Sequence, residues 1–251
     1  RSGAANLGTL TAGGLLTADA VGAMTVAAAK GTVLDMSAGT GLTAGTLTST
    51  AGKIGVDSVT GAVKIAAATA NGALTAKATA GDLNIGAFTA SSADLQAGND
   101  LTLTTATTSG ELLATAGRNA VLGTLTSSGD RVKVDTTGTL TATTVKAAKV
   151  VDLSGRAGLT ATTLTSTSAN IDVDSVAGSV NVKTANAITS FAARSYGAMT
   201  IGTFGVTAGY ASLVAGGMMT LTTGTTTGDM TLRNDGTTGN AASDSTTQMA
   251  L

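Results

Sequence analysis

The chain has 251 residues, with 34 glycines, no proline, cysteine, histidine or tryptophan, and a formal net charge of −1 at pH 7. This charge excludes the basic footprint of a nucleic-acid-binding domain, and the lack of histidine leaves acid–base chemistry to carboxylates. Because the aromatic residues are only two tyrosines and three phenylalanines, any core must be built from aliphatic side chains, alanine and threonine.

A short alternating pattern recurs along the chain and is clearest in GDLNI (81–85) and GSVNV (178–182). Aligning other segments with it gives first positions 18–21 residues apart. In chain order they are residues 3, 22, 40, 61, 81, 99, 118, 138, 157, 178, 197 and 217. The residues two and four places after each first position are apolar. Alternation with a period of two predicts a strand with one buried face in every repeat.

A second alternating apolar pair follows about ten residues later in most repeats. Each repeat should therefore hold two or three short strands separated by turns rich in Gly, Ser, Asn and Asp. A unit of 18–21 residues is too short for a helical hairpin. The sequence thus predicts an all-β fold, a parallel β-helix of about twelve coils and a length on the order of 55 Å.

Seven residues after each first position, large and small side chains alternate between repeats. Odd repeats carry Leu10, Leu47, Phe88, Leu125, Leu164 and Phe204, whereas even repeats carry Ala29, Ala68, Ala106, Val145, Ala185 and Gly224. Bulky side chains stacked directly on one another would overpack the interior, so the predicted unit is a two-coil module of about 39 residues. LTAGTLTSTAGKIGVDSV (42–59) returns as LTATTLTSTSANIDVDSV (159–176), 117 residues later, which fits three such modules.

The predicted core consists of inward-facing residues from these columns. Its members are Leu10, Leu47, Phe88, Leu125, Leu164, Phe204, Leu83, Ile85, Leu101, Leu103, Val180, Val182 and Ile201. The repeats predict one shaft over residues 1–235. Residues 236–251 (GTTGNAASDSTTQMAL) lose the pattern and are interpreted as a polar tail or linker.

The acidic candidates for chemistry on such a rod are Asp57, Asp135, Asp172 and Asp174. The last two flank the inward Val173 and should point outward together, with apolar or hydroxylic counterparts in the neighbouring coils. Enzymes that cleave polysaccharides need carboxylates that converge on one site. We therefore expect solvated side chains here, with no catalytic, cofactor-binding or metal-binding residue, no cofactor and no enzymatic activity.

The outward column three residues after each first position is threonine in seven of twelve repeats, with interruptions that include Lys64 and Val121. Threonines in such a ladder pack their methyls and hydrogen-bond their hydroxyls between coils. A threonine ladder could also match an ice lattice, so ice binding is a rival function. The next outward column mixes Gly, Ala, Thr and Lys183, which favours a solvated ladder instead.

The stretches GDLNIGAFTASSADLQAGNDLTLTTA and GRNAVLGTLTSSGDRVKVDTTGTLTATT resemble the repeat region of filamentous-haemagglutinin-type exoproteins. These are long adhesins that Gram-negative bacteria export by two-partner secretion. The resemblance covers roughly residues 3–235 and rests on the style of the repeats. It implies a right-handed β-helical shaft that projects from the outer membrane and serves adhesion, aggregation or biofilm formation, without catalytic residues.

The resulting hypothesis is a shaft segment of a secreted fibrous adhesin on the surface of a Gram-negative bacterium. The alternatives are a subunit that stacks end to end into an extracellular matrix filament, an ice-binding β-solenoid, and a polysaccharide-degrading enzyme. Expected partners are other copies, joined end to end or laterally, and a host or neighbouring cell reached through parts outside this chain. We expect no nucleic-acid partner and no membrane insertion, because the longest apolar runs are far shorter than the roughly 20 residues of a membrane span.

Overall fold

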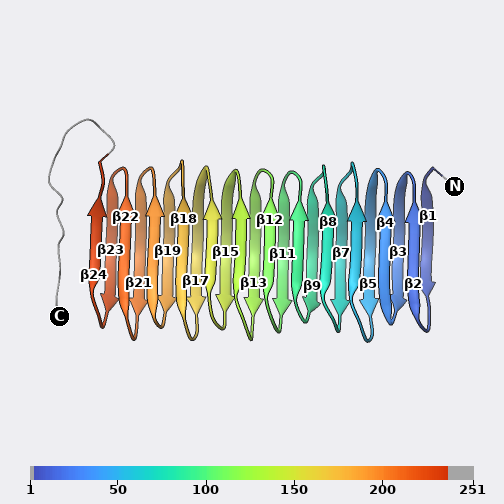
Figure 1. The fold of residues 1–251 in the computed structure, drawn as a ribbon, viewed down its shortest axis with the longest axis horizontal. Coiled ribbons are helices and arrows are strands. Elements are labelled where there is room, and N and C mark those ends of the chain that lie inside the picture. The colour runs from blue at the N-terminus through green and yellow to red at the C-terminus, as the bar shows by residue number, and fades with distance from the viewer. Residues whose placement is uncertain (1–2, 237–251) are drawn as a thin grey trace.

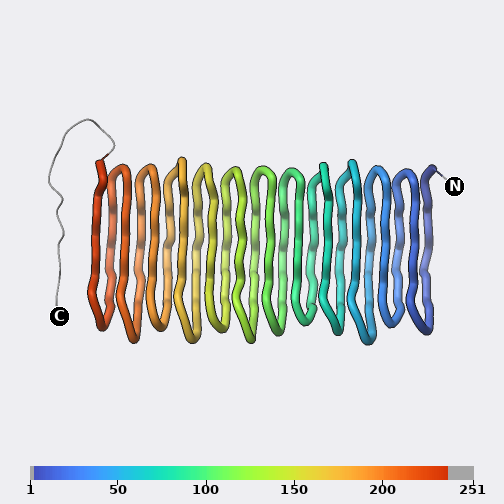
Figure 2. Tube along the Cα trace, viewed as in Figure 1, coloured from blue at the N-terminus to red at the C-terminus, as the bar shows by residue number. Residues whose placement is uncertain are grey.

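The computed structural model describes residues 3–236, which wind into a flattened solenoid with the first and last described strands at opposite ends of the rod (Figure 1). The predicted polar tail lies, from residue 237 on, outside the described residues. Twelve coils follow one another, and each gives one strand to each of two 12-stranded sheets. The path of the coils is regular along the rod (Figure 2). The predicted all-β parallel solenoid is confirmed, with two strands in each coil, while its right hand stays a prediction.

The first sheet, called the odd sheet, contains the first strand of every coil, and each strand pairs in parallel with the strands of adjacent coils. Its strands are β1 (Ala5–Thr11), β3 (Ala23–Gly31), β5 (Gly41–Ser49), β7 (Val63–Ala70), β9 (Leu83–Ala90), β11 (Leu101–Thr108), β13 (Ala120–Ser127), β15 (Thr139–Ala147), β17 (Gly158–Ser166), β19 (Val180–Ala187), β21 (Met199–Val206) and β23 (Met219–Thr226).

The second sheet, called the even sheet, contains the second strand of every coil, and each of these strands is shorter than the odd strand of its coil. They are β2 (Leu15–Ala20), β4 (Val33–Ala38), β6 (Ile54–Ser58), β8 (Leu74–Ala78), β10 (Ala93–Ala97), β12 (Leu112–Ala116), β14 (Val132–Thr136), β16 (Val151–Gly155), β18 (Asn170–Ser175), β20 (Ser190–Ser195), β22 (Tyr210–Ala215) and β24 (Met230–Asn234).

Alternation along the odd strands breaks once, at the same place in each coil. In β7, Val63 and Ile65 point inward, the next two residues are both outside the core, and Ala68 points inward again. The pairing register omits the first of those two residues, because Ala44 pairs with Ile65 whereas Thr46 pairs with Ala67. The residues four and seven places after each first position therefore both face inward, and the two residues between them both face outward.

The large–small alternation predicts how the coils stack, and the register confirms it. Phe88 pairs with Ala68 on one side and with Ala106 on the other. Close packing leaves no room for a second bulky layer. At the last coil the alternation reaches its limit, since a Cβ added at Gly224 would collide with the ring of Phe204. That ring also packs against Phe191 of the even sheet, with ring centroids 5.4 Å apart.

The core runs the length of the rod between the two sheets. Of the thirteen core residues proposed from the sequence, twelve are at most 4% exposed. Leu10, in the first coil, is partly buried and packs against this core. The second apolar pairs of the sequence, such as Leu74 and Ala76, face the core from the even sheet. Burial thus decreases toward the ends, where a coil has only one neighbour.

The residue just before each copy of the repeated segment has the same unusual backbone conformation. Gly41 and Gly158, which begin β5 and β17, have φ angles of 147° and 151°. Residues with a Cβ rarely adopt this region, so glycine is required at both places. The same conformation 117 positions apart shows that the similarity of 42–59 to 159–176 extends to local structure.

Buried hydroxyl groups bind the turns that follow several odd strands. The Ser49 hydroxyl donates to the carbonyl oxygens of Thr32, at 2.6 Å, and Gly52, at 2.8 Å, and accepts from the Gly52 N–H. Ser127 repeats the arrangement with Gly110 O at 2.6 Å and Asp130 N at 3.1 Å. These hydroxyls join a turn both to its own strand and to the previous coil.

Ser49 and Ser58 offer a matched pair of substitutions. Both are buried, but the Ser58 hydroxyl has no partner, alone among buried side-chain polar atoms of the described residues. We expect Ser49→Ala to lower the free energy of unfolding by about 1–3 kcal/mol, because it leaves the turn groups unsatisfied. Ser58→Ala should leave stability unchanged or raise it. Urea titrations measure both, and equal losses for the two variants would contradict this assignment.

Candidate functional site

Charged side chains gather on the outer face of the even sheet over four consecutive coils, and we call this group the charge cluster. Parallel register places Lys133, Asp152 and Asp172 in one outward column. The next column aligns Asp174 with Arg194. With Asp135 from β14, the cluster comprises Lys133, Asp135, Asp152, Asp172, Asp174 and Arg194.

Lys133 joins two strands of the cluster. Its Nζ lies 2.9 Å from Oδ2 of Asp152 and 3.4 Å from Oδ2 of Asp135. The hydrogen bond to Asp152 is the main reason why the pKa of Lys133 is raised, and the charges of Asp152 and Asp135 act in the same direction. Because these side chains are partly exposed, each pair contributes at most about 1 kcal/mol to stability.

Asp172 lies at the centre of the cluster and is half-buried. Burial raises its pKa, and the neighbouring charges of Asp152 and Asp174 add to this effect. A hydrogen bond from Asn170 Nδ2 to Asp172 Oδ2, 2.6 Å long, and the charge of Arg194 oppose it. The net result favours the protonated acid more than an exposed aspartate does.

The expectation that Asp172 and Asp174 have only apolar or hydroxylic counterparts in the neighbouring coils is wrong. Asp172 pairs with Asp152 in the preceding coil, and Asp174 pairs with Arg194 in the following coil. The sequence alignment missed these partners because it was anchored on the odd strands. Turns of different length then displace the even strands, so Asp152 and Asp172 lie 14 and 15 residues after their first positions.

A polar hollow of about 390 Å³ lies over this cluster. Its charged lining consists of Lys133, Asp152, Asp172, Asp174 and Arg194. Three carboxylates and two cations line it, so its formal charge is −1. Within residues 3–236, no group of three or more acidic side chains is placed to hold a metal ion. The arrangement is suited to binding a small polar or zwitterionic group at the surface.

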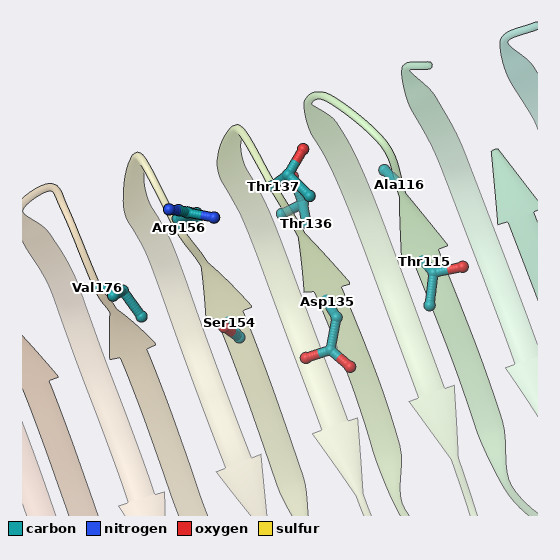
Figure 3. A pocket seen from close by; sticks show the side chains of 8 residues that line it. All are labelled: Thr115, Ala116, Asp135, Thr136, Thr137, Ser154, Arg156 and Val176. Carbon is teal, nitrogen blue, oxygen red and sulfur yellow. The ribbon is translucent and has the colours of Figure 1, made fainter. Parts of the chain in front are cut away.

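A second hollow, of about 550 Å³, lies beside the first at the edge of the even sheet. Figure 3 shows its lining side chains spread over successive strands and turns. Asp135 and Arg156 carry its only charges, beside the exposed Val176 and several hydroxyls. Among the earlier candidates, Asp57 lies outside both hollows, six coils from Asp174 on the same sheet.

The outer face of the odd sheet is rich in threonine, and its part over the last seven coils is called the threonine face. Where the alternation breaks, two successive residues face outward, and the second of them is threonine in every one of these coils. Register stacks them as Thr105, Thr124, Thr144, Thr163, Thr184, Thr203 and Thr223. One rung is hydrogen-bonded, from Thr203 Oγ1 to Thr184 Oγ1 at 3.4 Å.

Sequence reasoning missed this ladder because it took the mixed column containing Lys183 as the neighbour of the first threonine column. The column seven residues after each first position contains the signal that could have found it. Inward residues at positions four and seven require two successive outward residues. Threonines two residues further on, such as Thr126 and Thr165, complete Thr-x-Thr pairs about 7 Å apart along a strand.

The two ends of the described rod have strands with a single neighbour. β1 and β2 pair only with the second coil, and β23 and β24 only with the eleventh. Apolar side chains are exposed there, and Leu15 and Met218 are 62% and 72% exposed. A strand edge of this kind is a template for further pairing.

Comparison of the chain with protein-family models, with curated proteins and with solved structures found no match. In the described part of the chain, no helix has the length and apolarity needed to cross a membrane. Function is therefore inferred from the rod, its two faces and its ends.

The raised pKa of Asp172 predicts that ionisation of this side chain lowers the free energy of unfolding. The folded state binds the proton more tightly than the unfolded state, so the free energy of unfolding falls as pH rises through the raised pKa. Asp172→Asn should raise the melting temperature near pH 7, and the gain should vanish below about pH 3, where both states are protonated. Thermal melts at the two pH values measure this, with the exposed Asp57→Asn as control. A gain that is equal at both pH values would contradict the assignment.

Proposed function

We propose that the chain is a structural shaft segment of a secreted bacterial fibre of the filamentous-haemagglutinin type, without enzymatic activity. The observation that carries this proposal is the regular stack of twelve coils around one continuous core. In a solenoid each coil is stabilised by its neighbours, so adding coils lengthens the rod without changing its cross-section. A rod of this kind holds an adhesive part away from the cell.

The two kinds of face support the same proposal. Their outward side chains are short and mostly uncharged, and Lys133 forms ion pairs with two carboxylates of the charge cluster. The chain contains no histidine, which leaves acid–base catalysis to carboxylates alone. The resemblance of the repeats to filamentous-haemagglutinin-type adhesins supplies the adhesive and extracellular part of the proposal.

A shaft should tolerate loss of a two-coil module better than loss of one coil. Deleting residues 99–137 removes coils 6 and 7 and places Phe88 against Val145, which keeps a large residue beside a smaller one. Deleting residues 99–117 removes coil 6 alone and places Phe88 against Leu125. We expect overpacking at this one new junction to cost the shorter deletion about 1–3 kcal/mol.

Urea titration and electron microscopy test both deletions. The two-coil variant should stay a cooperative rod, shorter by about 10 Å. Collapse of both variants, or a particle that is not a rod, would contradict the shaft. In the intact chain, filaments that lengthen with concentration would instead favour the end-to-end subunit, whereas single rods of about 55 Å favour a shaft segment.

The threonine face favours ice binding as a second candidate function. Its hydroxyls and methyls repeat about every 4.8 Å along the rod and about every 7 Å along each strand, which approaches the repeat of water molecules on a prism face of ice. Only Lys146 and Lys183 bring charge into this face.

An ice-recrystallisation assay tests this candidate. If the face binds ice, Thr163→Tyr should abolish inhibition of crystal growth, because the ring would hold the lattice away from the ladder. Thr75→Tyr, an exposed position on the even sheet, is the matched control and should be inert. Crystal growth equal to that in a bovine serum albumin solution would rule out this function.

A further inference from the structure

The two faces of the rod carry opposite charge. The strands of the odd sheet contain four lysines and no acidic residue, whereas those of the even sheet contain eight aspartates and four basic residues. Their formal charges are therefore +4 and −4. The lysines are Lys30, Lys64, Lys146 and Lys183, and the aspartates are Asp19, Asp35, Asp57, Asp94, Asp135, Asp152, Asp172 and Asp174.

These charges are available to a partner. All four lysines of the odd sheet are exposed, and none forms an ion pair within residues 3–236. On the even sheet, Lys133 forms ion pairs with Asp135 and Asp152. Exposed aspartates such as Asp19, Asp57 and Asp174 have no ion pair within the described residues.

The charges also match in position along the rod. Each lysine-bearing strand directly follows an aspartate-bearing strand in the chain, in the pairs β2/β3, β6/β7, β14/β15 and β18/β19. Strands of the two sheets interleave along the axis (Figure 1), so the members of each pair lie at neighbouring levels. A second rod displaced across the sheets, without being turned, would bring each lysine near the level of an aspartate.

We propose that the odd face of one chain docks on the even face of a second copy, with both rods parallel. The odd face measures about 55 by 26 Å, or about 1,400 Å², and the even face, with its shorter strands, about 55 by 18 Å, or about 1,000 Å². Both areas exceed the roughly 800 Å² that each partner buries in a standard interface. Because the two docking faces differ, each rod keeps one face free after docking. A further copy can bind there, so the contact repeats and builds layers of rods. This side-by-side contact does not depend on the adhesive role proposed above.

Sedimentation velocity over a range of protein and salt concentrations tests the contact. Exposed ion pairs are screened within about 10 Å at 0.1 M salt. We expect the sedimentation coefficient to rise with protein concentration at about 0.02 M salt, and the dissociation constant to weaken at least about tenfold by about 0.5 M salt. A chain that stays monomeric at low salt would overturn the proposal.

Charge reversal on the two faces gives the sharper experiment. One variant carries Lys30→Glu, Lys64→Glu and Lys183→Glu, so that both of its faces are negative. The other carries Asp19→Lys, Asp57→Lys and Asp174→Lys, so that both of its faces are positive. Neither variant should associate alone, but an equimolar mixture should, because each face then meets its opposite.

The matched control for the first variant lowers the net charge by the same six units in the turns, with Lys53→Glu, Lys149→Glu and Arg156→Glu, and should associate like the original chain. The Lys149 substitution also removes its ion pair with Asp130, which the folding check below covers. Circular dichroism melts check folding, and Lys30→Gln, Lys64→Gln and Lys183→Gln replace the first variant if it unfolds. Association that survives reversal of the odd face, or a mixture that stays monomeric, would overturn the proposal. Binding of heparin by a chain that never self-associates would assign the lysines to a polyanion and would also overturn it.

Discussion

Parallel, in-register hydrogen bonding between successive coils is the constraint on which the structure depends. Each residue of a strand lies directly over its counterpart one coil earlier, so every side chain must pack against the residues at the same position in the coils before and after it. This explains why Phe88 needs Ala68 and Ala106 as neighbours, and why threonines form an unbroken column of seven on the outside. Core and surface are therefore both one-dimensional arrays, and a local change is felt mainly in the adjacent coils.

The periodicity of the odd strands was enough to predict the fold class, the number of coils and the two-coil module, because inward residues recur there at constant spacing. The even strands were harder, since turns of different length displace them from any single alignment. For that reason Asp152 and Arg194 escaped notice as neighbours of Asp172 and Asp174. The sequence analysis also missed the threonine ladder, because it assumed strict alternation, which does not allow for two successive outward residues.

The surface chemistry follows from the same stacking. Lys133 and Asp152, opposite charges in adjacent coils, form an ion pair that neutralises both. Carboxylates that fall beside one another instead, as Asp152 and Asp172 do, raise the pKa of the more buried one.

A net charge of −1 conceals how unevenly the charge is distributed. Four unit charges of opposite sign on two layers about 10 Å apart amount to a transverse dipole of at least about 40 electron-ångströms. This dipole is perpendicular to the axis and grows with every module that repeats the pattern. Near an anionic surface, a rod of this kind has a preferred side, with the lysines of the odd sheet toward the surface and the carboxylates of the even sheet toward the solution.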